Sequence, residues 1–351
     1  MLTINGKNNS AICYTDSMDD ESRRVLSEIC EKPYSEASRI RIMPDVHYDG
    51  HNSVVGFTMT MPDYIVMELE YAAGCGMYCA KLGQNDIDLC EFDRICHEIP
   101  HGSELWAAPI AEFDFGRLKC SRQLLWKNMY LHSLGTLGGG NHFVELDIDE
   151  EGNHYLVIHS GGGNLPHDVY KYYRNKYKDE NVITGSDRQD YLHDVSVCVE
   201  FAKLNRKLMS RYICERLDLE IVDEFDCVHH YFDTKKNIAR HGATSAEKGE
   251  RVIIPINMKD GCILATGKGN PEWNYSAPHG AGRIMSRRDA RQTFSMDEYL
   301  AETDGLFSTT VNETTLDESP MAYKRIEEIT RYIEDTVTID KIIKPIFNFK
   351  P

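Results

Sequence analysis

The sequence predicts an α+β fold, with mixed or antiparallel sheets flanked by helices, in a single domain spanning residues 1–351. Short apolar runs of strand type alternate with loops and a few helical patterns. Neither an internal repeat nor a low-complexity linker interrupts the chain. A length of 351 residues allows one large domain or two closely fused lobes, and the absence of a repeat or linker favours one domain.

The clearest expected element is a long helix over residues 187–215. Ser186 and Gln189 have the spacing of a capping box at its start. Asn205 falls within its apolar stripe, where an amide is usually a satisfied core contact but can also face a cleft. The stripe is formed by Tyr191, Val195, Cys198, Ala202, Leu208 and Met209.

Shorter helices and strands complete the expected elements. The helices are predicted over residues 19–31, 120–132 and 321–337. Three apolar runs of strand type lie at 156–158, 252–254 and 262–264. Each run leads into a polar or glycine-rich segment, and functional sites often lie where strands end.

The net charge of −17 opposes the approach of nucleic acid to the surface as a whole. Local basic patches would have to overcome this field. Basic residues gather at 205–207, 235–236, 240–241 and 283–288. For each of these clusters the alternative is an ordinary solvated surface.

The chain has no run of about 18 apolar residues, and its first residues do not combine a basic region with an apolar one. We therefore expect a cytoplasmic protein without a membrane partner. Its 11 cysteines are odd in number and lack paired spacing, which favours reduced thiols over a disulfide framework.

The segment 270–287 contains the strongest candidate for a nucleophile. His279 is followed by Gly280, Ala281 and Gly282, whose small size lets backbone N–H groups approach a ligand closely. Arg283 and Arg287 offer forked donors that match phosphate oxygens. A histidine in this setting is suited to attack phosphorus. The alternative is a glycine-rich turn that carries a structural histidine.

Four other segments place metal-ligand side chains beside glycine-rich or strand-type sequence. They contribute Cys75, His142, His159 and His229. One thiolate with three imidazoles suits Mn, Fe, Co or Zn, and one sulfur atom can bridge two ions. For any single histidine a core or surface position is the more common reading. Four such residues in similar contexts together favour a metal site.

These motifs resemble those of the RtcB-type RNA-splicing ligases, from Met43 to Lys350. The segment 134–145 is similar to the family's Asn-His-Phe motif, and His159-Ser-Gly to its second metal histidine. Residues 267–287 are similar to the segment that contains the family's guanylylated histidine. The segment 317–324 and the closing lysine also fit.

The resemblance implies a central metal-containing cleft and a ligase that uses GTP and two Mn²⁺ ions. Its substrates would be RNA ends bearing a 3′-phosphate or 2′,3′-cyclic phosphate and RNA ends bearing a 5′-hydroxyl. His279 would become bonded to GMP, which then passes to the RNA 3′-phosphate. An archease-like activator is a further partner that the resemblance implies.

The resemblance also assigns roles to individual residues. Metal binding falls to Cys75, His142, His159 and His229. Nucleotide binding falls to Asn141, Phe143, Glu145, His230, Asn257, Gly280, Ala281, Gly282, Tyr323 and Lys350. Contacts to RNA or phosphate are expected from Arg240, Arg283 and Arg287.

The chain departs from the family pattern near the metal and the phosphate. Ala72 stands where the family has an aspartate ligand, so water, a nearby acid such as Asp45, or a different metal must fill that position. His230 replaces an asparagine, and Gly163 replaces an arginine. These changes leave two alternatives to a ligase: a metal-dependent phosphoesterase or nucleotidyltransferase, and a catalytically silent RNA- or nucleotide-binding relative.

Overall fold

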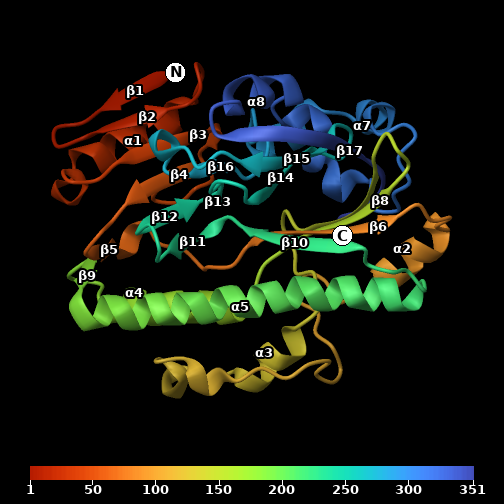
Figure 1. Cartoon of the computed structure of the whole chain (residues 1–351), viewed down its shortest axis with the longest axis horizontal. Coiled ribbons are helices and arrows are strands. Elements are labelled where there is room, and N and C mark those ends of the chain that lie inside the picture. The colour runs from red at the N-terminus through yellow and green to blue at the C-terminus, as the bar shows by residue number, and fades with distance from the viewer.

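The computed structural model describes residues 1–351, and two large sheets form its body (Figure 1). The six-stranded sheet contains, in spatial order, β1 (Leu2–Asn5), β2 (Ser10–Cys13), β3 (Ile40–His47), β4 (Val55–Thr60), β12 (Ile238–His241) and β11 (His230–Asp233). The seven-stranded sheet contains β10 (Asp223–Val228), β6 (Gly76–Gly83), β8 (His154–Ser160), β7 (Phe143–Ile148), β17 (Val337–Phe349), β15 (Gly261–Gly267) and β14 (Arg251–Asn257).

Nearly all strand pairs are antiparallel, with β2 and β3 forming the one parallel pair. Two small sheets accompany the large ones, one from β13 (Ala243–Ser245) and β16 (Ser276–Pro278) and one from β5 (Tyr64–Val66) and β9 (Val182–Thr184). The expectation of an α+β fold with mixed or antiparallel sheets is confirmed.

Helices lie on the outside of the sheets (Figure 1). They are α1 (Asp20–Glu31), α2 (Leu89–Glu98), α3 (Lys127–Ser133), α4 (Asn164–Lys176), α5 (Gly185–Arg216), α6 (Arg287–Thr293), α7 (Met296–Glu302) and α8 (Ile326–Ile333). None of these helices has both the length and the apolar composition that crossing a membrane requires.

Helix α5 runs beneath both sheets and joins their cores (Figure 1). Its first half contributes Tyr191, Val195 and Phe201 to the largest apolar cluster, which packs against the six-stranded sheet. Its second half contributes Met209 and Ile213 to a second cluster under the seven-stranded sheet. The predicted helix and its apolar stripe are confirmed. The predicted capping box is wrong, because the helix begins at Gly185 and Thr184 precedes it without a side-chain cap.

The shorter helices differ more from expectation. Helix α1 is confirmed, with Asp19 as its N-cap. The segment 120–132 is helical only from Lys127, after a short 3₁₀ turn. The prediction of a helix over 321–337 is too long, because Tyr323 is extended and bridges to Arg283, and β17 begins at Val337. The three predicted strands are confirmed within β8, β14 and β15.

Candidate active site

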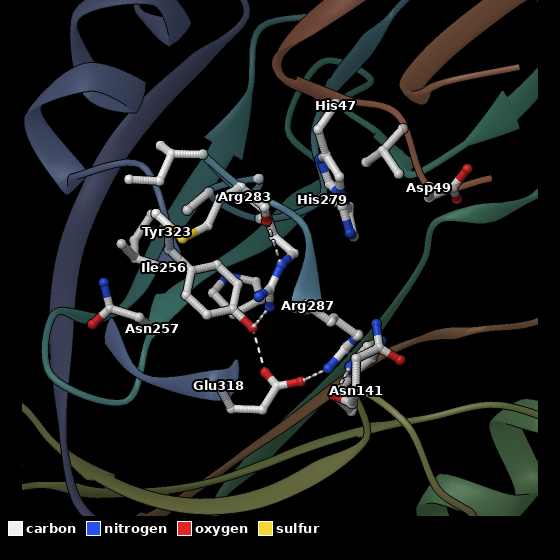
Figure 2. Close-up of a pocket in the computed structure, with 18 of the residues that line it drawn as sticks. His47, Asp49, Asn141, Ile256, Asn257, His279, Arg283, Arg287, Glu318 and Tyr323 are labelled. Carbon is white, nitrogen blue, oxygen red and sulfur yellow. Dashed lines mark hydrogen bonds and ion pairs between the residues drawn. The ribbon is translucent and has the colours of Figure 1, made fainter. Parts of the chain in front are cut away.

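A cavity of about 930 Å³ opens between the sheets and the segment that precedes α6. Figure 2 shows His47 and His279 on one side of it and Glu318 and Tyr323 on another. Most of the residues predicted from sequence line this cavity. They are Asn141, Phe143, Glu145, His159, His229, His230, Asn257, His279, Gly280, Ala281, Gly282, Arg283, Arg287, Tyr323 and Lys350.

The four predicted metal ligands meet at one edge of the seven-stranded sheet. The strands β10, β6, β8 and β7 are neighbours in that order, and each pair is antiparallel. Consequently β10 and β8 end at the edge where β6 and β7 begin. His229 and His159 lie at strand ends, whereas Cys75 and His142 lie directly before strands. Two of the four therefore precede strands and two lie at strand ends, and all four converge at the same edge of the sheet.

The side chains of Cys75, His142, His159 and His229, here called the thiol–imidazole cluster, are in close contact. Cys75 Sγ lies 3.7 Å from His142 Nε2 and 3.3 Å from His159 Nε2. His159 Nε2 lies 3.3 Å from His229 Nε2. The potential metal-ligand atoms of the four side chains thus point toward a common space.

Two backbone carbonyls decide which imidazole nitrogen is available. His142 Nδ1 lies 2.8 Å from the oxygen of Leu137, and His159 Nδ1 lies 3.0 Å from the oxygen of Asn141. A carbonyl can only accept, so each Nδ1 carries the proton and each Nε2 has a free lone pair. Such outer contacts orient histidine ligands in metal sites.

Burial keeps these groups uncharged. It lowers the pKa of His142 to about 4 and the pKa values of His159 and His229 well below the ordinary range. Burial also raises the pKa of Cys75 to about 11, against a smaller opposing effect of Arg206. Neutral imidazoles are ready to bind a cation, while the thiol would lose its proton when one binds.

Two polar residues of α5 hold the loops around the cluster. Arg206 is buried, pairs with Asp226 and donates to the carbonyls of Gly74 and Ser160. Asn205 accepts from the N–H groups of Gly135 and Thr136. Within the basic cluster at 205–207, Arg206 is therefore buried and stabilises the loops. Asn205 is a core residue whose side chain is fully hydrogen-bonded. Their position on the buried stripe of α5 is the sequence signal for this role.

His279 is positioned by Asp45, a residue of β3. Asp45 Oδ2 lies 2.7 Å from His279 Nδ1 and accepts from the His279 backbone N–H at 3.1 Å. Because the carboxylate holds the proton on Nδ1, Nε2 keeps its lone pair. The His279 ring centroid is 4.8 Å from that of His229. Asp45, first considered as a replacement metal ligand, contacts the proposed nucleophile instead.

Gly282 allows this close approach of two distant segments. Its φ is +74°, and a Cβ at this position would lie 2.1 Å from the oxygen of Asp45. Any larger residue would push the segment containing His279 away from β3. This is a physical reason for glycine in the motif that sequence alone did not reveal.

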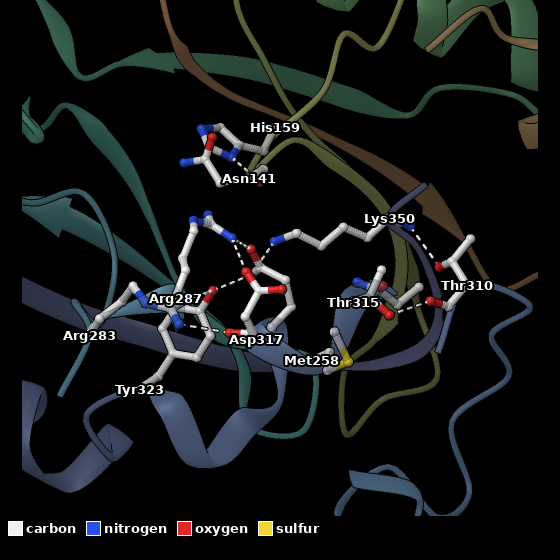
Figure 3. A network of polar contacts seen from close by, with 12 residues as sticks. Asn141, His159, Met258, Arg283, Arg287, Thr310, Thr315, Asp317, Tyr323 and Lys350 are labelled. Atoms are coloured by element: carbon white, nitrogen blue, oxygen red, sulfur yellow. Dashed lines mark hydrogen bonds and ion pairs between the residues drawn. The ribbon is translucent and has the colours of Figure 1, made fainter. Parts of the chain in front are cut away.

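The other end of the cavity is a polar network that includes Arg287, Asp317 and Lys350 (Figure 3), and Glu318 lies at its centre. Lys350 Nζ lies 2.6 Å from Glu318 Oε2, and Arg287 and Tyr323 also donate to this carboxylate. Arg287 further pairs with Asp317 at 2.7 Å. Burial by itself would raise the pKa of Glu318, but Lys350 and Arg287 hold it well below its ordinary range. Glu318 lies within the motif at 317–324, yet its role was not predicted.

The remaining nucleotide-binding candidates surround this network. Glu145 accepts from Asn348 Nδ2 at 2.8 Å, and burial raises its pKa to about 7. The Phe143 ring lies 5.7 Å from Lys350 Nζ. Asn257 accepts from the N–H groups of Lys259 and Asp260, so it also stabilises its own turn.

Among the predicted phosphate-binding residues, Arg240 does not line the cavity. Its guanidinium is buried, pairs with Asp233 at 2.8 Å and donates to Ser276 at 3.0 Å. Arg283 and Arg287 do line the cavity. Arg283 donates to the carbonyl of Asp317 at 2.7 Å. Cys75 and His142 do not line the cavity either, but both lie against His159, which does.

Comparison with known proteins agrees with the resemblance seen in the motifs. The family model described as tRNA-splicing ligase RtcB matches residues 121–351. The RNA-splicing ligase RtcB of Escherichia coli K12 is 28% identical, covering 92% of this chain and 92% of its own length. The tRNA-splicing ligase RtcB of Nanoarchaeum equitans is 30% identical, covering 60% of this chain and 57% of its own length.

Proposed function

This chain belongs to the RtcB family, and from that membership we propose that it is an RNA ligase. Its substrates would be RNA ends bearing a 3′-phosphate or 2′,3′-cyclic phosphate and RNA ends bearing a 5′-hydroxyl. GTP and Mn²⁺ would be its cofactors, and GMP would be carried on His279. The relatives' names state splicing of RNA or tRNA, so a tRNA or repair substrate is the natural first choice, with an archease-like activator as a partner to test.

The observation that supports this proposal most directly is the setting of His279. Asp45 fixes the proton on Nδ1, the ring faces the thiol–imidazole cluster, and small residues follow it in the chain. A neutral imidazole with a free Nε2 is an effective nucleophile, and the buried carboxylate stabilises the positive charge that develops on the ring.

A 2′,3′-cyclic phosphate end would first be opened by water, which breaks the bond from phosphorus to the 2′-oxygen and leaves a 3′-phosphate and a 2′-hydroxyl. The proposed reaction then has three transfers at phosphorus. First, His279 Nε2 attacks the α-phosphorus of GTP, and the bond to the β-phosphate oxygen breaks as pyrophosphate leaves. Second, an oxygen of the RNA 3′-phosphate attacks the same phosphorus, and the nitrogen–phosphorus bond breaks. Third, the 5′-hydroxyl attacks the activated RNA phosphorus and releases GMP. The covalent relay divides one difficult step into easier ones.

The donor set fits divalent ions of the Mn, Fe, Co and Zn group, because one thiol and neutral imidazoles converge with their lone pairs facing one another. Bound ions would neutralise the charge of the phosphate oxygens. The residues of the chain then have separate tasks. Asp45 orients the nucleophile, whereas Glu145 and Lys350 offer an acceptor and a donor to a guanine base.

The proposal is tested by incubating the protein with GTP labelled at the α-phosphorus, in the presence of Mn²⁺. We expect label bound covalently to the wild type and lost in His279→Ala. His241→Ala is the matched control, because His241 is a buried histidine near the cavity that is held by Ser53 and Asp49. This variant should keep the label if it is folded, as judged by its circular dichroism.

Failure of the wild type to acquire label while it binds Mn²⁺ would contradict the proposal. That result would favour a silent nucleotide- or RNA-binding relative, an alternative that Ala72 keeps open. Label that is transferred to RNA without joining the ends would favour a nucleotidyltransferase.

A further inference from the structure

Cys75 belongs to two groups of potential ligands. In the first group its sulfur lies with His142 and His159, and in the second with His229 and His230. Within each group the ligand atoms lie within 4.8 Å of one another. The thiol–imidazole cluster described above accounts for every member except His230.

The backbone explains how two consecutive histidines reach the same sulfur. Neighbouring residues of a regular strand point to opposite faces. Here β10 ends at Val228 and β11 begins at His230, so the chain leaves one sheet and enters the other between them. The loop before β6 is fastened at this point, because Gly74 donates to the oxygen of His230 and His229 donates to the oxygen of Cys75.

His230 also differs from its neighbour His241, whose ring is tilted against it with the ring centroids 4.7 Å apart. His241 is satisfied at both ring nitrogens, by Ser53 Oγ at 2.7 Å and Asp49 Oδ2 at 3.1 Å. His230 Nδ1 is buried and has no hydrogen-bond partner. A structural histidine would be expected to resemble His241, because unpaired buried polar atoms are costly.

We propose that His230 is a metal ligand, and that Cys75, His229 and His230 hold one divalent ion while Cys75, His142 and His159 hold a second. The side chain at position 72 is a methyl group without a donor atom. The imidazole of His230 therefore supplies the ligand that the family's aspartate would supply at position 72. This inference rests on the proposed function only in that divalent ions bind at this end of the cavity.

The exchange of a carboxylate for an imidazole changes which ion the site prefers. A thiolate with two imidazoles contributes one negative charge, whereas a thiolate, an imidazole and a carboxylate contribute two. Imidazole suits Zn²⁺ and Co²⁺, and carboxylate suits Mn²⁺. The site with His230 should thus favour Zn²⁺ and Co²⁺ over Mn²⁺ more strongly than a site with an aspartate at position 72.

The test is a Co²⁺ titration of chelator-treated full-length protein, followed by thiolate-to-cobalt absorption and by metal analysis. We expect two ions per chain for the wild type. His230→Asn should bind one ion as before and the second at least about 10-fold more weakly, since even outer-shell changes cost about 10–100-fold. His51→Asn is the matched control, because the His51 ring lies beside that of His241, as the His230 ring does, but is exposed.

The double variant Ala72→Asp with His230→Asn gives the second readout. It should regain the second ion and show a higher ratio of Mn²⁺ to Co²⁺ affinity than the wild type. The circular dichroism of the single variant should match that of the wild type, so that its loss of an ion reflects a lost ligand and not a lost fold. Two ions bound by His230→Asn with unchanged affinities would overturn the inference, as would a double variant that binds no better than His230→Asn.

Labelling of His279 with GTP separates this inference from the proposed function. If His230→Asn loses an ion but the wild type never acquires label, the metal assignment stands and the ligase proposal fails. If the wild type acquires label and His230→Asn keeps both ions, the ligase proposal stands and the metal assignment fails.

Discussion

Buried polar groups are arranged differently at the two ends of the cavity: they are paired charges at one end and neutral groups at the other. Around Glu318, positive and negative side chains pair with one another, so this network is complete within the protein. At the thiol–imidazole cluster the groups are neutral donors whose lone pairs face each other, and they have no protein cation between them. The difference indicates that the first end is preorganised by the chain itself, whereas the second offers the ligand atoms that the metal ions we propose would bring together.

The largest effect on this comparison is expected from Cys75→Ser. Cys75 is shared by both groups of ligands, so its loss should weaken both ions and reduce labelling of His279 by more than about 100-fold. The charges around Glu318 should be unaffected. Metal analysis and the labelling rate measure the change. Cys79→Ser is the control, since Cys79 is buried in β6, the strand that directly follows Cys75, but belongs to neither group. A variant that loses only one ion would refute the sharing of sulfur.

Asp45→Asn should have the next largest effect. An asparagine can donate its amide N–H to His279 Nδ1, which would move the ring proton to Nε2 and block the nucleophile. We expect labelling to fall about 10–100-fold, a typical cost of misplaced reacting groups, while the number of bound ions stays the same. Equal loss of metal and label would show that Asp45 acts on the cluster rather than on His279.

A smaller effect is expected from Glu318→Gln, which removes one charge from the complete end of the cavity. The amide still accepts from Lys350, so the free energy of unfolding should fall by only about 1–3 kcal/mol at pH 7. Denaturant unfolding at several pH values measures this change.

The pH dependence of the free energy of unfolding should also differ between the wild type and Glu318→Gln. Because the pKa of Glu318 is lowered in the folded state, its contribution is present above its unfolded pKa of about 4.3 and is lost as pH falls below it. The difference between wild type and Glu318→Gln should therefore shrink in acid. A constant difference across pH would mean that the ion pairs do not stabilise the fold.

Local sequence patterns predicted the elements well where burial and periodicity agree. The apolar stripe of α5 was sufficient to predict that helix, and the apolar runs in β8, β14 and β15 were sufficient to predict those strands. The prediction of secondary structure failed where a distant segment pairs with the backbone of the predicted element. The bridge between Tyr323 and Arg283 keeps the chain extended before α8, and no pattern within residues 321–337 reveals it.

Candidate site residues were also identified from sequence more readily than their partners. Motifs marked His279 and the four residues of the thiol–imidazole cluster. They did not show that Arg206 braces the loops, that Arg240 is buried away from the cavity, or that Glu318 gathers Lys350 and Arg287. Each of these roles depends on which opposite charge lies nearby, and that is set by packing.

The sequence by itself determined which chemical groups are available: one thiol, several imidazoles, and a histidine among small residues with arginines after it. Only the tertiary structure decided which of them meet and which nitrogen is free to react. Asp45 and His279 are 234 residues apart, and the four residues of the thiol–imidazole cluster lie at or next to the ends of four strands whose order in the sheet differs from their order in the chain. Hydrogen bonds and burial between such distant segments set the proton positions, and no local pattern of residues encodes them.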